Sequence, residues 1–118
     1  MTATENKIEK TGFEERYLAL RKKEGRLHSD AETLQLPDVA PEHPHYHEWK
    51  LRKESARRLQ RYLLKKNPLL KILEAGCGNG WLCHYLSSVP GAQITGTDIN
   101  FAELQQAARV FSHIPNLE

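Results

Sequence analysis

The second half of the chain alternates short apolar runs with amphipathic stretches. Residues 69–75 read LLKILEA and residues 93–97 read QITGT, both of strand length. Residues 81–88 and 101–112 instead repeat apolar side chains at helical spacing. The pattern predicts a β–loop–α–β–α order, with two parallel strands joined by a right-handed crossover. Because the first run is apolar almost throughout, it predicts a strand buried on both faces.

The first half of the chain predicts two helices and an irregular connection. Residues 13–25 place apolar side chains three and four positions apart and end at a glycine, which favours a helix stop. Residues 46–66 carry a longer stripe that includes Trp49 and Ala56. Between them, residues 28–44 contain three prolines and little periodicity, so we expect a connection without regular structure there.

Composition divides the chain at the same place as the pattern. The 118 residues are 39% apolar and 27% charged, which is typical of one soluble domain, and the net charge is only +2. Most of the charges lie before Asn67 and Pro68, which break the second helix. We therefore predict an N-terminal helical lid or scaffold over residues 1–66. Residues 67–118 would form the first βαβα part of a ligand-binding domain.

The sequence also predicts where the protein resides. No apolar segment that would mark a signal peptide follows the polar start, and no run reaches the length of a membrane span. The two cysteines, Cys77 and Cys83, form no disulfide framework, so a cytoplasmic protein with no membrane partner is expected.

The segment ILEAGCGNGW, residues 72–81, contains the candidate ligand-binding loop. A glycine loop that leaves a parallel strand and opens a helix lets the backbone approach a ligand closely. Asp98 ends the second strand, and adjacent parallel strands bring their carboxyl ends together. A carboxylate there can accept hydrogen bonds from both hydroxyls of a ribose, which predicts a site for an adenosine-like group.

The spacing argues against a dinucleotide. The dinucleotide fingerprint G-x-G-x-x-G needs its third glycine where this chain has Trp81. Glu74, just before the loop, would repel a pyrophosphate but favour a cationic amino group. A nicotinamide-dependent or flavin-dependent oxidoreductase is therefore the less favoured alternative. A tight turn that binds nothing is a further alternative.

The arrangement E-x-G-x-G-x-G over residues 74–80, followed by Asp98, resembles the first two motifs of class I S-adenosylmethionine-dependent methyltransferases. The resemblance covers residues 69–112 and implies a Rossmann-like α/β fold, with S-adenosyl-L-methionine as cofactor and an unidentified methyl acceptor. It implies that Glu74 binds the amino group of the cofactor, that Asp98 holds the ribose and that Ile99 packs on the adenine. The loop residues Gly76, Cys77, Gly78 and Gly80 would lie beside the methionine part.

The family fold has seven strands, whereas this sequence supplies two before Glu118. We therefore expect the N-terminal part of a longer enzyme, truncated to the first two parallel strands. The activity of these 118 residues alone is doubtful on this ground. The alternative function is a non-catalytic cofactor-binding or interaction fragment. Two apolar strands with unpaired edges also predict self-association through those edges.

The stretch PDVAPEHPHYHEW, residues 37–49, leaves its role open. Its alternating histidines, His43, His45 and His47, could bind a metal, but no closing fourth ligand is evident and no metal site is predicted. The stretch could also form a lid that places Tyr46 or His47 near the substrate, which makes these two the candidates for a catalytic base. The third interpretation is a solvated loop.

The helix over residues 48–66 is strongly basic. Such a face could bind nucleic acid, but it is more often solvated, with long side chains covering apolar surface. The aromatic residues lie mostly on the packing stripe and not among the charges. Nucleic acid is therefore not a predicted partner.

Overall fold

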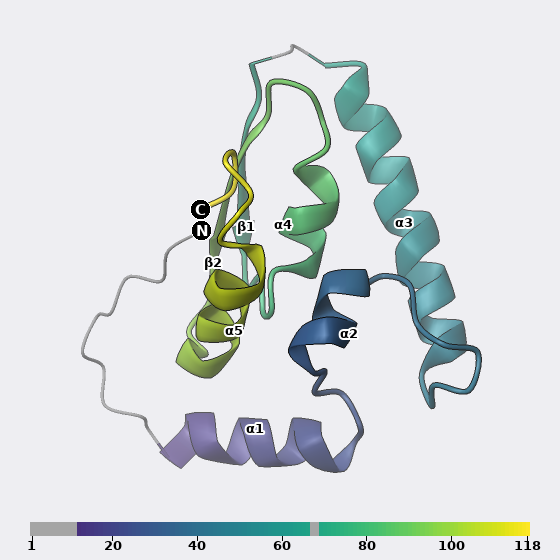
Figure 1. Ribbon diagram of the computed structural model, residues 1–118, viewed down its shortest axis with the longest axis vertical. Coiled ribbons are helices and arrows are strands. Elements are labelled where there is room, and N and C mark those ends of the chain that lie inside the picture. Colours follow the sequence, from purple (N-terminus) through teal and green to yellow (C-terminus); the bar gives the residue numbers. More distant parts are fainter. Residues whose placement is uncertain (1–11, 67–68) are drawn as a thin grey trace.

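The computed structural model describes residues 12–66 and 69–118. Figure 1 shows the order of the elements, with α1 lying across the end of the molecule toward which the strands point. Within the described residues, none of the helices combines the length and the apolar character needed to cross a bilayer. The helices and strands are α1 (Gly12–Lys23), α2 (Asp30–Gln35), α3 (Tyr46–Leu64), β1 (Lys71–Ala75), α4 (Trp81–Leu86), β2 (Gln93–Thr97) and α5 (Phe101–Phe111).

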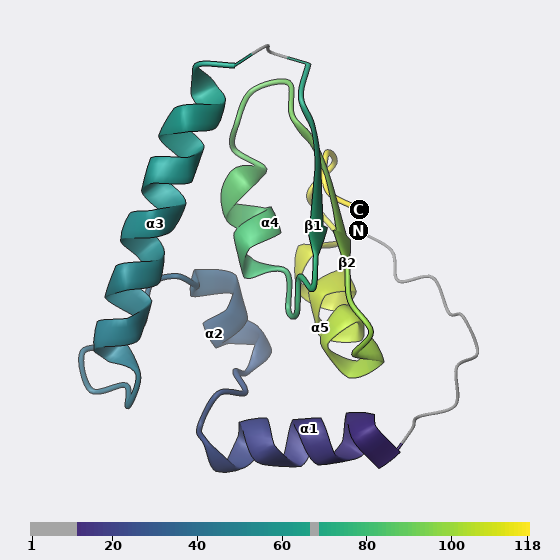
Figure 2. The ribbon, with the colours of Figure 1, turned by 180° about the vertical axis from the view of Figure 1, so that it is seen from behind.

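The predicted β–loop–α–β–α order is confirmed. Strands β1 and β2 pair in parallel, in a register that runs from Lys71 opposite Gln93 to Ala75 opposite Thr97. Helix α4 is the crossover between them, and Figure 2 shows it packed beside the strands on the side of α3. The fold is therefore α/β, and both strands end at the same edge of the sheet.

The prediction that the first strand is buried on both faces is wrong. Exposure alternates along β1 and β2, so that Ile72, Glu74, Ile94 and Gly96 are covered while their neighbours are exposed. Leu73 is 68% exposed. The apolar run resembles a central strand of a parallel sheet, but two-sided burial needs helices on both faces. The described helices cover only one face of the sheet.

The two strands do not have equivalent edges. The outer edge of β2 is bonded by residues 116–118, because Ile94 N donates to Asn116 O and Glu118 N donates to Ile94 O. One of the two edges expected to be unpaired is thus occupied. Among the described residues no strand pairs with the outer edge of β1. Self-association through this edge stays a prediction.

The core lies under the covered face of the sheet. It is built around Phe111 and Ile94, which are almost fully buried, and includes both cysteines, which are free thiols. Cys83 is therefore a small buried residue, as expected for a cysteine on the inner side of α4. Besides Phe111, Ile94 and the two cysteines, the buried members of the core are Leu86, Val89, Ala92, Ala107 and Leu117.

The first half forms the expected helix α1 but differs from the sequence expectation in the segment that follows it. The apolar stripe of α1 faces outward, since Phe13 is 60% and Leu20 is 54% exposed. Residues 28–44, expected to be irregular, contain the helix α2. Its start is a capping box in which Ser29 and Glu32 bond each other's backbone amides. The pattern Ser-x-x-Glu is a sequence signal for this start, but six residues are too few to show periodicity.

Polar contacts join the first half to α5. The carboxylate of Glu14 on α1 accepts a hydrogen bond from Phe101 N at 3.0 Å, at the positive end of the α5 dipole. Asp30 on α2 receives two hydrogen bonds from Arg109, at 2.7 and 2.8 Å. These contacts hold α1 and α2 over the sheet edge where the strands end. The division of the chain at residue 66 stays a prediction.

Gly80 is the position in the glycine loop with the least room for a side chain. Its φ of +82° is left-handed, and a Cβ there would lie 3.1 Å from Ala107 Cβ and 3.4 Å from Phe111 Cδ2. We predict that Gly80→Ala lowers the free energy of unfolding by about 1–3 kcal/mol, because it adds strain and crowds the core. Denaturant unfolding followed by circular dichroism measures this.

The matched control is Gly12→Ala on α1, where φ is not left-handed and a Cβ would meet only Arg16 Nη2, at 3.6 Å. This control should change the free energy of unfolding by less than about 1 kcal/mol. Equal effects of the two substitutions would contradict the account of the loop.

Candidate functional site

A cavity of about 270 Å³ lies between the carboxyl edge of the sheet and the first half of the chain. One wall comes from the glycine loop and three carboxylates, those of Glu74, Asp98 and Glu103. The opposite wall comes from α1, the segment between α1 and α2, α3 and the residue directly before α3. It carries three arginines and several aromatic rings: Arg21, Arg26, Arg52, Tyr17, Trp49, His28 and His45. Trp81 completes the cavity and packs against Trp49, edge to face, at 5.2 Å between ring centroids.

The glycine loop is held at its base by the end of β2. Gly76 N and Cys77 N both donate to Thr97 O, at 2.7 and 2.9 Å. Farther along the loop, Gly78 N donates to the Asp98 carboxylate at 2.7 Å. The other carboxylate oxygen of Asp98 accepts Asn100 N at 2.7 Å. Asp98 therefore positions the loop and the start of α5 together.

Gly76 leaves the cavity open above the loop. Its φ is +73°, and a Cβ built there would meet nothing within 4 Å. A backbone that is bare on the side of a cavity allows a ligand to approach the peptide groups directly. By contrast, Gly80 faces α5 and does not line the cavity. Gly76 thus gives a ligand access to the backbone, whereas Gly80 allows the loop to pack against α5.

Glu74 is half-buried where β1 meets the loop. The Cys83 thiol donates to Glu74 Oε2 at 3.0 Å. Burial raises the pKa of Glu74, the Cys83 hydrogen bond opposes that rise, and the charge of Asp98 adds to it. A carboxylate whose ionised form is disfavoured gains more from a cationic ligand than an exposed one does.

The two cysteines support the loop from below. Cys77 lines the cavity yet is only 4% exposed, and its sulfur lies against Gly96. The hydrogen bond with Cys77, together with burial, raises the pKa of Cys83 well above its ordinary value. Cys83 therefore stays a thiol, and a thiol is a poor nucleophile.

The structure brings five of the seven residues expected at a cofactor site to the cavity. They are Glu74, Gly76, Cys77, Gly78 and Asp98. Gly80 lies behind the loop, and Ile99 lies outside the cavity lining with 86% of its surface exposed. An apolar side chain that exposed, directly after Asp98, offers a surface on which a flat ring could pack.

The two candidates for a catalytic base do not line the cavity. His47 is exposed and packs its ring against Tyr46 at 5.5 Å between centroids. The cavity instead receives His45 and His28. His45 Nε2 is bonded to Glu24 O at 2.7 Å. Burial lowers the pKa of His28, so this imidazole is neutral near pH 7.

Sequence reasoning missed the cationic wall and Glu103. Arg26 bonds Glu48 through both carboxylate oxygens at 3.1 Å, and Arg52 bonds the same carboxylate at 2.7 Å. Arg26 and Glu48 are 22 positions apart, so no local spacing signals their contact, whereas Arg52 lies four positions after Glu48 on α3. Glu103 lies five positions after Asp98 in the first turn of α5, where an acid is ordinarily read as helix capping.

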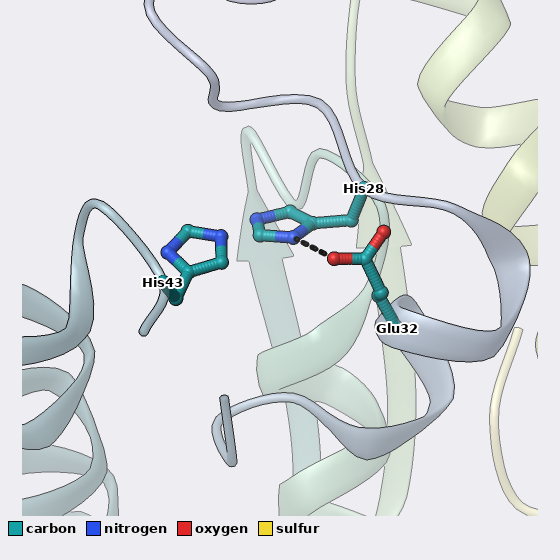
Figure 3. A group of neighbouring side chains, drawn as sticks. All are labelled: His28, Glu32 and His43. Carbon is teal, nitrogen blue, oxygen red and sulfur yellow. Dashed lines mark ion pairs between the residues drawn. The ribbon is translucent and has the colours of Figure 1, made fainter. Parts of the chain in front are cut away.

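Three potential metal-binding side chains come together beside the cavity. Ligand atoms of His28, Glu32 and His43 lie within 4.8 Å of one another (Figure 3). However, His43 Nδ1 accepts a hydrogen bond from His45 N at 3.0 Å. In the neutral ring the proton is then on the other nitrogen, Nε2, which faces His28 in Figure 3. As folded, His43 offers no lone pair toward His28 and Glu32, which does not favour metal binding.

An α/β fold with this glycine loop and a terminal aspartate defines a Rossmann-like domain. Comparison with protein families matches residues 45–116, more than half of the chain, to a family described as a methyltransferase domain. The chain belongs to this family. The resemblance to class I methyltransferases seen in the sequence is thereby confirmed. The roles of the individual site residues stay predictions.

Solved structures include a similar one, the X-ray structure of YjhP from E. coli. The two chains share 22% sequence identity with a TM-score of 0.49, over 86% of this chain and 34% of that one. The chain thus spans about a third of the length of YjhP. Comparison with curated proteins gave no match.

Proposed function

We propose that this methyltransferase domain binds S-adenosyl-L-methionine and supplies the cofactor site for transfer of its methyl group to an unidentified acceptor. The observation that carries the proposal is the hydrogen bond between Gly78 N and Asp98, which places a bare loop and a carboxylate in one cavity. The glycine loop, the carboxylate of Asp98 and the family match all indicate the same cofactor, whereas each observation alone would be weak evidence.

The residues of the cavity suit the polar groups of this cofactor. Glu74 would accept hydrogen bonds from the amino group. Each Asp98 oxygen has one protein donor in the structure, so each keeps a lone pair for a ribose hydroxyl. Arg21 lines the opposite wall, and its buried Nε has no hydrogen-bond partner, which suits the cofactor carboxylate. The exposed side chain of Ile99 would pack on the adenine.

When bound, S-adenosylmethionine would supply an electrophilic methyl group on its sulfonium sulfur, which an acceptor lone pair would take up as the carbon–sulfur bond broke. The chain's own contribution is to hold both partners in line and to exclude water. A weakly nucleophilic acceptor must also lose a proton. His28 is neutral and lines the cavity, so it replaces Tyr46 and His47 as the candidate to receive that proton.

Binding should depend on Asp98. Trp49 and Trp81 both line the cavity, so their fluorescence reports on a ligand there. We predict that S-adenosylmethionine and S-adenosylhomocysteine change this fluorescence in a saturable way and that NAD does not. Asp98→Ala should weaken binding at least about tenfold, because it removes charged hydrogen-bond acceptors from the ribose and from Gly78 N.

The control is Asp38→Ala, which removes an exposed carboxylate that pairs with Lys53 away from the cavity. It should leave both affinities unchanged. If the intact chain bound neither compound at millimolar concentration, the proposed function would be wrong.

The affinity should also depend on pH. Burial raises the pKa of Glu74 above its ordinary 4.5, and a cationic amino group favours the ionised carboxylate. The affinity for S-adenosylmethionine should therefore rise with pH through this pKa and level off above it. Below about pH 7 the amino group keeps its proton, so calorimetry from acid to neutral pH measures the effect.

Glu74→Gln should reduce this rise without abolishing it, because burial also raises the pKa of Glu103 at the same cavity. Glu54→Gln, on the exposed part of α3, is the control and should keep the full rise. An unchanged pH profile in Glu74→Gln would contradict the role given to Glu74.

A further inference from the structure

Glu103 is a buried acid in contact with the glycine loop. Its side chain is only 9% exposed. One carboxylate oxygen, Oε2, lies 3.4 Å from the position that a Cβ on Gly78 would occupy. The backbone N–H of Glu103 is taken by the Asn100 side chain, which starts α5 and fixes where Glu103 lies. The carboxylate is therefore held at the middle of the loop.

The Glu103 carboxylate differs from that of Asp98 in having no donor. In the part of the chain that the structure describes, no hydrogen bond reaches it, and the nearest cationic group is Arg21 Nη2, 3.9 Å from Oε1. Burial raises the pKa of Glu103, Arg21 opposes the rise, and Asp98 adds to it. A buried carboxylate with so little compensation is costly unless a positive ligand faces it.

We propose that Glu103 makes the cavity prefer the positively charged sulfonium of S-adenosylmethionine over the neutral thioether of S-adenosylhomocysteine. The inference rests on the proposed function. The two compounds share the amino group, carboxylate, ribose and adenine, so contacts with these groups contribute equally to both affinities. Only the methyl group and the charge on sulfur differ, and a fixed negative charge acts on that difference. Glu103 thereby favours entry of the cofactor and release of the product.

The size of the effect follows from the dimensions of the cavity. A cavity of about 270 Å³ keeps every group within reach of a charge on its wall. At the effective dielectric constant of a protein site, a unit charge at about 8–10 Å changes an affinity roughly tenfold. An effect of this size does not require contact between the sulfur atom and Glu103.

Removal of Arg21 should change the preference for the sulfonium in the opposite direction to removal of the Glu103 charge. Its guanidinium lines the same cavity and offsets the charge of Glu103. Any bond that Arg21 makes to the cofactor carboxylate affects both compounds alike and cancels in their ratio. Removal of Arg21 should therefore increase the preference for the sulfonium, whereas removal of the Glu103 charge should decrease it.

The experiment is calorimetric titration of the full chain with each compound at neutral pH, in wild type, Glu103→Gln, Arg21→Gln and Glu54→Gln. The measured quantity is the ratio of the Kd for S-adenosylhomocysteine to that for S-adenosylmethionine. We expect this ratio to fall roughly tenfold in Glu103→Gln and to rise in Arg21→Gln. It should be unchanged in Glu54→Gln, whose charge lies on the exposed face of α3.

A merely structural role for Glu103 would weaken both compounds equally, and a constant ratio would overturn this inference. If the wild type binds both compounds and Asp98→Ala loses them, a constant ratio in Glu103→Gln overturns the role of Glu103 alone. If the wild type binds neither compound, both this inference and the proposed function are overturned.

Discussion

The bonds between the glycine loop and the end of β2 are the constraint on which the site depends. Thr97 O accepts two amides at the base of the loop, and Asp98 accepts a third from Gly78. These bonds exist only because β1 and β2 are parallel and end at the same level. A shift in register would remove the acceptors and leave the amides without partners, which is costly where they are partly buried.

The two walls of the cavity are held by different forces. The glycine loop rests on a close-packed base, where Gly80 meets α5 and Gly96 leaves room for Cys77 and Cys83. On the opposite side, α3 packs its buried Trp49 against Trp81, whereas α1 and α2 are joined to α5 through polar contacts, of which the ion pair between Asp30 and Arg109 is exposed. Exposed ion pairs contribute little and are screened by salt, whereas buried packing is not. The glycine loop is therefore the most firmly held part of the site, and α1 and α2 are held less firmly.

Those features of the fold that depend on local sequence pattern could be predicted from the sequence. The strand order, the helix α4 and the position of Asp98 follow from apolar periodicity and from the rule that parallel strands end together. One-sided burial of β1 does not follow, because it depends on which helices the rest of the chain supplies. The helix α2 escaped prediction because its capping box is a short signal among prolines. The position of Glu103 opposite Arg21 depends on docking of residues some 80 positions apart, and no spacing rule anticipates such a contact. The cationic wall likewise needs Arg26 to meet Glu48, which lies 22 positions along the chain.

The central claim is that the loop and Asp98 form the binding site for S-adenosylmethionine. The most direct test is to titrate the ¹⁵N-labelled chain with this compound and follow the amide resonances. The account predicts saturable shifts centred on Gly76, Gly78 and the residues that follow Asp98, with the basic outer face of α3 unchanged. Saturable binding whose shifts lie on α3 and spare the glycine loop would contradict it.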